Sequence, residues 1–349
     1  MAESSACIAA EGPHRLPITS FFPPVVAFHA VAAHSYGQRY RPTAFLRSNC
    51  AGTHPIHDAT DTKRSIMDQE TIDLVAFDER HLDGAVLLSR EAGWPHRRED
   101  WAMLLALSHG FVALQGDAVV GTALLTPFGD DRATINMVIV AASMRGRGLG
   151  RKLMDAALAA CGARECRLTA TADGLPLYEK LGFSATHEIR QHQGIPTPLP
   201  ADAANGAVEL DWVGPESFPS VAALDLQALG MDRRPLLRLL VEAGRMVVLR
   251  EAGQVVGYAA LRPFGRGEVI GPVVANTLEQ AQSLLSFLIA SRPGAFLRVD
   301  TAEWPALSPW LSARGLAGAG GGIVMRRNEK GRQPLGPAKP FALASQALG

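Results

Sequence analysis

The stretch VIVAASMRGRGLGRKLM, residues 138–154, decides the fold of this chain because it joins a strand to a helix through a glycine-rich loop. Before the loop, the apolar run Thr134–Val140 is typical of a buried strand. After it, apolar residues recur with helical spacing over about Leu149–Ala160, which predicts an amphipathic helix. This order places the N-terminus of a helix at the end of a strand.

The glycine-rich loop predicts a phosphate-binding site. The first N–H groups of a helix have no partner within the helix and carry partial positive charge, so an oxyanion can accept several hydrogen bonds there. Glycines let an oxygen approach the backbone closely, and arginines add charged donors. The candidate residues are Arg145, Gly146, Arg147, Gly148, Leu149 and Gly150. The spacing does not fit Rossmann or Walker motifs, and a tight turn with solvated arginines is the alternative.

The loop lies in a series of alternating strands and helices. The sequence predicts strands at Thr71–Phe77, Phe111–Leu114, Val119–Thr126, Thr134–Val140, Cys166–Ala170 and Phe183–Arg190. It predicts helices at Arg80–Glu91, Arg98–Leu107, Leu149–Ala160 and Leu175–Leu181. The expected fold class is therefore α/β, with a twisted, mostly antiparallel mixed sheet that is flanked by helices.

Two sequence elements in this region resemble the GNAT superfamily of N-acetyltransferases. Arg145, Gly148 and Gly150 match the family's acetyl-CoA motif, Gln/Arg-x-x-Gly-x-Gly/Ala. LYEKLGF, residues 177–183, resembles the family's later LYxxxGF element. The resemblance implies an acyltransferase in which the backbone of Val138 and Val140 pairs with the pantetheine arm and the loop holds the pyrophosphate. It also implies that Tyr178 protonates the departing thiolate.

Three positions depart from the family's pattern. Ala142 stands where many members have Pro, Thr171 replaces the usual Asn, and Gly174 replaces the usual Ala. The last two differences put side-chain contacts to the pantetheine in doubt, but not the fold.

Acyl transfer to an amine also needs a group that accepts a proton, because only a neutral amine attacks a thioester. The sequence leaves this base open between Glu188, His187 and His96. The segment around Trp94 and His96 lies where the family usually builds its acceptor wall, so both are candidate substrate residues. Each of these side chains also has an ordinary packing or surface role as its alternative.

The second half of the chain repeats the first. VALQGDAVVGTALLTPFG, residues 112–129, aligns with VVLREAGQVVGYAALRPFG, residues 247–265, which predicts a second GNAT-like unit. No Arg-Gly-x-Gly loop follows its corresponding strand, where residues 276–279 read NTLE. It also lacks an LYxxxGF element, and WLSARGL stands at residues 310–316 instead. We therefore expect the second unit to be degenerate and to bind no acetyl-CoA.

Polar residues of the second unit form a possible substrate pocket. The set comprises Asp232, Arg233, Arg262, Arg266, Arg298 and Asp300. Arg298 and Asp300 alternate on a predicted strand, so they share a face and are the preferred substrate candidates. A structural ion-pair network or a solvated face is the alternative interpretation. Further on, the apolar stretch Pro340–Leu348 is expected to dock on the body of the protein.

The expected domain organisation has five parts. An N-terminal extension covers residues 1–66, and disorder, an organellar transit peptide or a misassigned start before Met67 would each explain it. A GNAT acetyltransferase domain (67–195), a linker (196–206), a degenerate GNAT-like domain (207–327) and a C-terminal tail (328–349) follow.

The composition narrows the function further. The chain has 349 residues, 47% of them hydrophobic, and a formal net charge of +0, which gives no reason to expect nucleic acid or a membrane surface as partner. Its four cysteines show no metal-ligand spacing, so we expect reduced thiols, no metal and a cytoplasmic location. The expected function is acetyl transfer from acetyl-CoA to a primary amine of a small molecule. A non-catalytic acyl-CoA sensor or scaffold is the alternative, and a homodimer remains open.

Overall fold

The computed structural model describes residues 71–197, 209–302, 304–331 and 336–349. The chain divides into two units, Met1–Ser65 and Ile66–Gly349, and all described residues belong to the second. The predicted N-terminal extension and most of the predicted linker lie outside the described residues. The domain bounds given above therefore stay predictions.

The first half of the described chain has the predicted order of strands and helices. Its strands are β1 (Ile72–Ala76), β2 (His109–Gln115), β3 (Ala118–Phe128), β4 (Arg132–Val140), β5 (Glu165–Ala170) and β6 (Ser184–Gly194). Its helices are α1 (Leu82–Glu91), α2 (Arg98–Leu107), α3 (Leu149–Cys161) and α4 (Leu175–Lys180). Asp78 caps a 3-10 turn, Glu79–His81, from which α1 continues. The predicted fold class is confirmed.

The second half repeats this order, as the sequence echo predicts. Its strands are β7 (Glu209–Trp212), β8 (Arg245–Glu251), β9 (Gln254–Phe264), β10 (Gly267–Ala275), β11 (Leu297–Thr301) and β12 (Ala317–Arg327). Its helices are α5 (Phe218–Leu229), α6 (Arg234–Ala243), α7 (Leu278–Ala290) and α8 (Trp304–Ser312). The strand β13 (Lys339–Ala342) follows β12 and has no counterpart in the described part of the first half.

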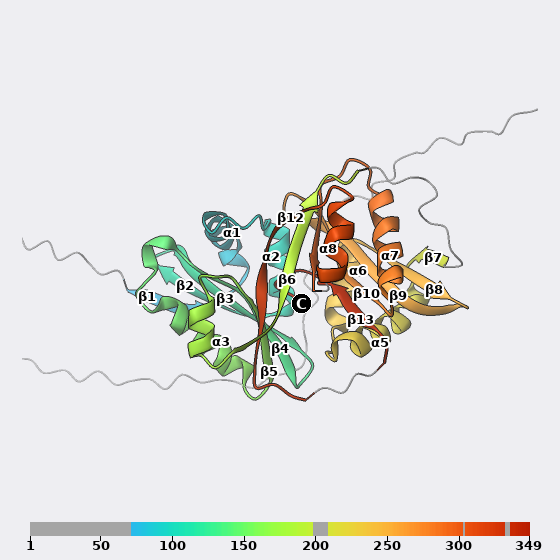
Figure 1. Ribbon diagram of the computed structural model, residues 1–349. Helices are drawn as coiled ribbons and strands as arrows, with labels where there is room; N and C mark the ends of the chain where they lie inside the picture. The colour runs from blue at the N-terminus through green and yellow to red at the C-terminus, as the bar shows by residue number, and fades with distance from the viewer. Residues whose placement is uncertain (1–70, 198–208, 303, 332–335) are drawn as a thin grey trace, which may run out of the picture. The chain divides into compact units, whose positions relative to one another are not determined.

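The two halves exchange strands in the middle of one sheet (Figure 1). The strand order is β1-β2-β3-β4-β5-β12-β6-β11-β13-β10-β9-β8-β7. The last strand of the repeat, β12, pairs antiparallel with β5, and β6 in turn pairs antiparallel with β11. The hydrogen-bonded sheet therefore does not divide at the linker between the halves.

The strands β4 and β5 start as a parallel pair and then diverge. Their register runs only from Arg132 opposite Glu165 to Thr134 opposite Arg167. A bulge in β4 places Met137 and Val138 opposite a single residue of β3, and Met137 has a φ of 50°. The remaining residues of β4 therefore offer backbone N–H and C=O groups toward the gap, as an unpaired strand edge does.

Hydrophobic burial joins the two halves as well. One core cluster contains α3 and β4 side chains of the first half together with Leu236, Leu240 and Tyr258 of the second half. A buried ion pair crosses the same boundary, with 3.5 Å between Arg262 Nη1 and Asp100 Oδ1. Cys161 and Cys166 are buried free thiols, as small apolar residues would be.

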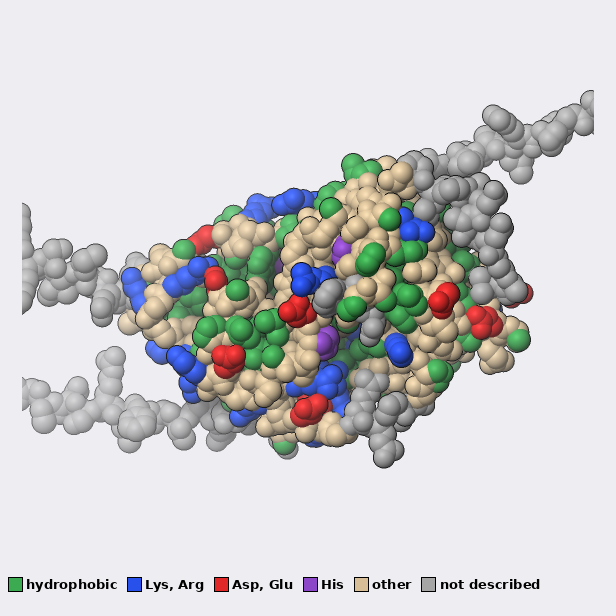
Figure 2. Space-filling view, in the orientation of Figure 1, with side chains coloured by type: hydrophobic (Ala, Val, Ile, Leu, Met, Phe, Trp, Pro, Cys, Tyr) green, Lys and Arg blue, Asp and Glu red, His purple; other side chains and the backbone are tan. Residues whose placement is uncertain are grey.

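The surface carries charged side chains of both signs (Figure 2). Figure 2 shows basic and acidic side chains scattered over this face of the molecule, in keeping with the net charge of zero. Among the described residues, no helix is long and apolar enough to cross a bilayer. In the same part of the chain, no group of His, Cys, Asp or Glu is arranged to hold a metal ion.

Candidate active site

A cavity of about 390 Å³ lies at the gap between β4 and β5. From β4 it is lined by Ile135, Asn136 and Met137, and from β5 by Thr169 and the following Thr171. Its volume lies within the range of small-molecule sites. The cavity thus meets the β4 bulge at the point where the strand edge loses its partner. We call it the main cavity.

The glycine-rich loop forms the N-terminus of α3 close to this gap. Gly148 is the N-cap of α3 in the left-handed conformation, with φ 77°, and no side chain caps the helix. Gly146 also has a positive φ of 75°, and open space surrounds the position that a Cβ would take on either glycine. Arg147 is exposed, and Arg145 Nη1 lies 4.0 Å from Asp173 Oδ2. The first N–H groups of α3 are therefore accessible to an anion.

Tyr178 lies on α4, which packs beside the start of α3. A Cβ on Gly150 would meet Leu177 at 3.6 Å, so the two predicted motifs are neighbours. The Tyr178 side chain is buried, and burial raises the pKa of its hydroxyl to about 12. A Cβ on Gly174 would lie only 2.7 Å from the Tyr178 ring. Glycine at this departure from the family pattern thus makes room for the tyrosine.

Ala142, like Gly174, departs from the family pattern for a reason that the structure shows. Its backbone N–H donates to Glu91 Oε1 at 2.8 Å, which ties the end of α1 to the chain after β4. The Pro that many family members have here carries no N–H and could not make this bond.

The predicted acceptor residues Trp94 and His96 do line the main cavity. Burial lowers the pKa of His96 to about 4, so its imidazole is neutral at neutral pH. Its Nδ1 has no hydrogen-bond partner among the described residues. Its ring packs edge-on against the ring of Phe264, with 5.3 Å between the two ring centroids. The other candidate bases, His187 and Glu188, are exposed on β6 and do not belong to this lining.

The six polar residues predicted to form one pocket do not do so. Arg266 and Arg298 line the main cavity, whereas Asp300 is fully buried beneath Arg298 and binds its guanidinium at 2.9 Å. The others form separate ion pairs: Arg233 with Asp225 at 2.6 Å, Asp232 with Arg234 at 2.5 Å, and Arg262 with Asp100 at 3.5 Å. Arg233 and Arg262 find partners on other elements, which sequence spacing cannot show, whereas Asp232 pairs with a residue two positions along the chain.

Several residues that line the main cavity carry no sequence motif that would predict their place there. The lining includes Asn136, Gln191, Gln193 and Glu268, and Glu268 pairs with Arg292 at 2.6 Å. Gln191 and Gln193 alternate on β6 and so share a face, but only the strand exchange brings this face to the cavity. The docking of the C-terminal stretch is confirmed, because β13 pairs with β10 and both Phe341 and Leu348 are buried.

The corresponding gap in the second half, between β10 and β11, is filled. Strand β13 pairs with β10 on the side that faces β11, and a Cβ on Gly271 would clash with the backbone oxygen of Leu343. The next helix, α7, caps its own N-terminus, since Thr277 accepts from the N–H of Gln280 and the Gln280 side chain accepts in return. Neither a free strand edge nor an open helix N-terminus is left there.

Comparisons with known proteins agree with this architecture. Residues 76–183 match the model of the acetyltransferase (GNAT) family, and residues 221–335 match an acetyltransferase (GNAT) domain. An uncharacterized N-acetyltransferase, YitH of Bacillus subtilis, is 30% identical over 79% of this chain and 98% of its own length. The crystal structure of a putative acetyltransferase from Pyrococcus horikoshii matches with a TM-score of 0.66 at 17% identity. It covers 83% of this chain and 99% of its own.

A second solved structure has the same tandem layout. A tandem GNAT protein from the clavulanic acid biosynthesis pathway matches with a TM-score of 0.52 at 17% identity, over 75% of this chain and all of its own. At these identities the solved structures show a common fold alone.

Proposed function

This chain belongs to the GNAT family of N-acetyltransferases, and we propose that it transfers an acetyl group from acetyl-CoA to a primary amine of a small molecule. Two GNAT domains and the curated relative make it an acyltransferase of the tandem GNAT type. The donor, the acceptor class and the residue roles below are proposals. Two neighbouring features of the first half carry them: the free edge of β4, which borders the main cavity, and the uncapped N-terminus of α3, which lies beside Val140 at the end of β4. The loop from Arg145 to Gly150 and Tyr178 do not themselves line the main cavity.

The residues of the first half fit acetyl-CoA in three ways. The edge of β4 at Val138 and Val140 offers backbone groups to the amides of a pantetheine arm. The loop from Arg145 to Gly150 offers N–H groups and two arginines to a pyrophosphate. At Gly146 and Gly148, no side chain obstructs the approach. When bound, acetyl-CoA supplies a thioester whose carbonyl carbon is open to attack by a neutral amine.

The bulge in β4 supplies the place for the reacting carbonyl. Thr122 Oγ1 donates to the carbonyl oxygen of Met137 at 2.8 Å, which holds the bulge in place. We assign the N–H of Val138, which the bulge takes out of the regular register with β3, to the oxygen on which negative charge develops. The C–N bond forms at this point as the C–S bond breaks.

The reaction also moves two protons, one that the departing thiolate gains and one that the attacking amine loses. Burial keeps Tyr178 protonated, so its hydroxyl can give a proton to the departing sulfur. His96 accepts the proton that the amine loses, directly or through one water, because its neutral Nδ1 is free of described partners and it lines the cavity. The low pKa of His96 makes it a weak base, so positioning of the two substrates carries most of the rate.

The experiment that tests this function measures free CoA thiol after mixing the protein with acetyl-CoA and a panel of primary amines. Turnover with at least one amine is the expected result. Tight acetyl-CoA binding without thiol release from any amine would instead support the alternative, a non-catalytic acyl-CoA sensor or scaffold. The panel needs amino acids, polyamines and amino sugars, because the lining combines charged, amide and aromatic groups.

A further inference from the structure

A second, smaller cavity lies beside the main one. Its volume is about 100 Å³, and it is enclosed by β4, β5, β6, β12 and the C-terminal segment. Thr169 and Gln346 line both cavities, so the two are adjacent. This volume is enough for several waters or for one small oxyanion.

The charged side chains that line this cavity are basic, and the backbone oxygen of Gly349, which also lines it, accepts a hydrogen bond from Arg233 Nη1. Arg167 and Arg326 line it, and the described lining contains no Asp or Glu. His187 completes the polar wall although it remains partly exposed, and partial desolvation together with the nearby Arg326 and Arg167 lowers the pKa of its imidazole. The wall therefore holds two permanent positive charges, since arginine stays protonated in proteins.

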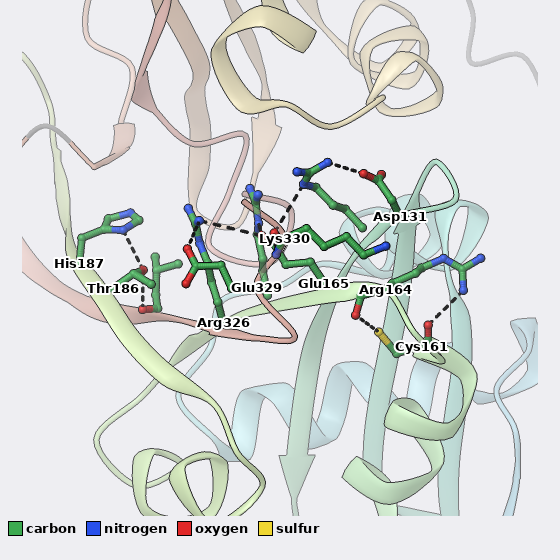
Figure 3. A network of polar contacts seen from close by, with 12 residues as sticks. Asp131, Cys161, Arg164, Glu165, Thr186, His187, Arg326, Glu329 and Lys330 are labelled. Carbon is green, nitrogen blue, oxygen red and sulfur yellow. Dashed lines mark hydrogen bonds and ion pairs between the residues drawn. The ribbon is translucent and has the colours of Figure 1, made fainter. Parts of the chain in front are cut away.

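The acidic partners of these arginines do not line the cavity, and Figure 3 shows Glu165 and Glu329 beside Arg326. Glu165 is fully buried, and its Oε1 binds Arg167 Nε at 2.6 Å and lies 4.0 Å from Arg326 Nη1. Its Oε2 accepts from the N–H of Lys330 at 3.0 Å and lies 3.7 Å from Arg132 Nε. One buried carboxylate is thus surrounded by three guanidinium groups.

Donors remain unused on the same arginines. The Arg167 side chain is nine-tenths buried, yet its Nη2 has no hydrogen-bond partner among the described residues. The Nε of Arg326 is buried and in the same state. A buried charged donor without a partner is costly, and a bidentate oxyanion is the ligand that guanidinium groups fit best.

We propose that this cavity binds a small oxyanion, a carboxylate or a phosphate group, next to the acceptor amine. The charged lining and the unused donors of Arg167 and Arg326 carry this assignment. Because the cavity adjoins the main one, the oxyanion is carried by the acceptor itself, a claim that rests on the proposed function. The preferred acceptor then has an acidic group a short distance from its primary amine.

The site is tested first without catalysis, with inorganic phosphate as the probe. Binding is followed by calorimetry on the full chain, with sodium chloride at equal ionic strength as the reference. Arg326→Gln removes one charge from the cavity. Arg327→Gln is the matched control, because it removes the same charge from the next residue of β12, which points to the other face and does not line the cavity.

We expect wild type and Arg327→Gln to bind phosphate alike, and Arg326→Gln to bind it at least tenfold more weakly. Thermal melts in chloride show that both variants are folded. Failure of the wild-type protein to bind phosphate, or equal binding by the two variants, would overturn the site. The phosphate-binding measurement does not depend on catalysis, so it tests the site even if no amine is acetylated.

The source of the oxyanion is tested by turnover of matched amines. Phenylalanine and phenethylamine differ only in the carboxylate. If the acceptor carries the group, phenylalanine has the higher kcat/KM, phosphate competes with it, and Arg326→Gln removes the preference. If phenethylamine is preferred and phosphate does not compete, the acceptor claim is wrong and the site belongs to a free anion.

Discussion

The two diverging strand pairs of the sheet, β4 with β5 and β10 with β11, begin alike and end differently. Each pair is parallel over its first residues, and β4 and β10 each carry a bulge at the point of divergence. In the first half the gap opens into the main cavity. In the second half β13 occupies the gap and supplies the missing hydrogen bonds.

The helices that follow these pairs differ in the same direction. The N-terminus of α3 has a left-handed glycine and no side-chain cap, whereas Thr277 and Gln280 cap α7 from both sides. Where the strand edge and the helix end are left unsatisfied, a ligand can satisfy them. Where the chain satisfies them itself, these backbone groups are no longer available to a ligand.

The largest expected effect comes from Gly148→Val, which disturbs the open helix end. A β-branched side chain at a φ of 77° is strained, so the first N–H groups of α3 turn away from the pyrophosphate. We expect acetyl-CoA affinity to fall more than about 100-fold in calorimetry, since several charge-assisted hydrogen bonds are lost together.

Gly253→Val is the control for this change. Gly253 has a φ of 76°, also with open space at the Cβ position, but it lies in the turn between β8 and β9. It introduces similar strain and should leave acetyl-CoA affinity unchanged. Equal losses of affinity in the two variants would show that strain alone, and not the position of Gly148, weakens binding.

Next in size is the effect of Tyr178→Phe. Loss of the hydroxyl removes the proton donor to the leaving thiolate, so kcat should fall about 100-fold, while acetyl-CoA affinity stays within about twofold. Steady-state kinetics together with calorimetry separate the two quantities. An unchanged kcat would remove Tyr178 from the mechanism.

A smaller effect is expected on the stability of the protein when the pH is lowered, because His96 is buried in its neutral form. His96 has a folded-state pKa of about 4 against an ordinary value of 6.5, so the unfolded chain binds more protons between these values. This group's contribution to stability is therefore complete above pH 6.5 and is lost as the pH falls toward 4. Its share of the slope is at most about 1.4 kcal/mol per pH unit.

Urea denaturation from pH 4 to 7.5 measures this slope. His96→Asn, which does not titrate, should flatten the profile below pH 6.5. An identical profile in wild type and variant would mean that His96 is not buried as a neutral imidazole.

The smallest effect comes from Thr277→Ala. Loss of the N-cap at α7 should lower the free energy of unfolding by about 1 kcal/mol. It should create no cofactor site, because β13 still fills the gap beside it. A second bound acetyl-CoA in this variant would mean that capping alone had closed the second unit.

The sequence predicts the local elements well, because helix and strand periods, caps and glycine turns are local. The bounds of α2 agree residue for residue, and α3 differs by one residue at its end. The strand exchange left no such trace, since β12 meets β5 across more than a hundred residues without a local signal. The same holds for the positions of Gln191 and Gln346 in the main cavity and for the smaller cavity that Arg167 lines. These arrangements form only when the strands are exchanged.

Titration of acetyl-CoA into the wild-type protein by calorimetry tests the central claim most directly. The contrast between the two gaps predicts one acetyl-CoA bound per chain, with this binding lost in Gly148→Val and kept in Gly253→Val. Two bound equivalents per chain, or a single equivalent that survives Gly148→Val, would contradict it.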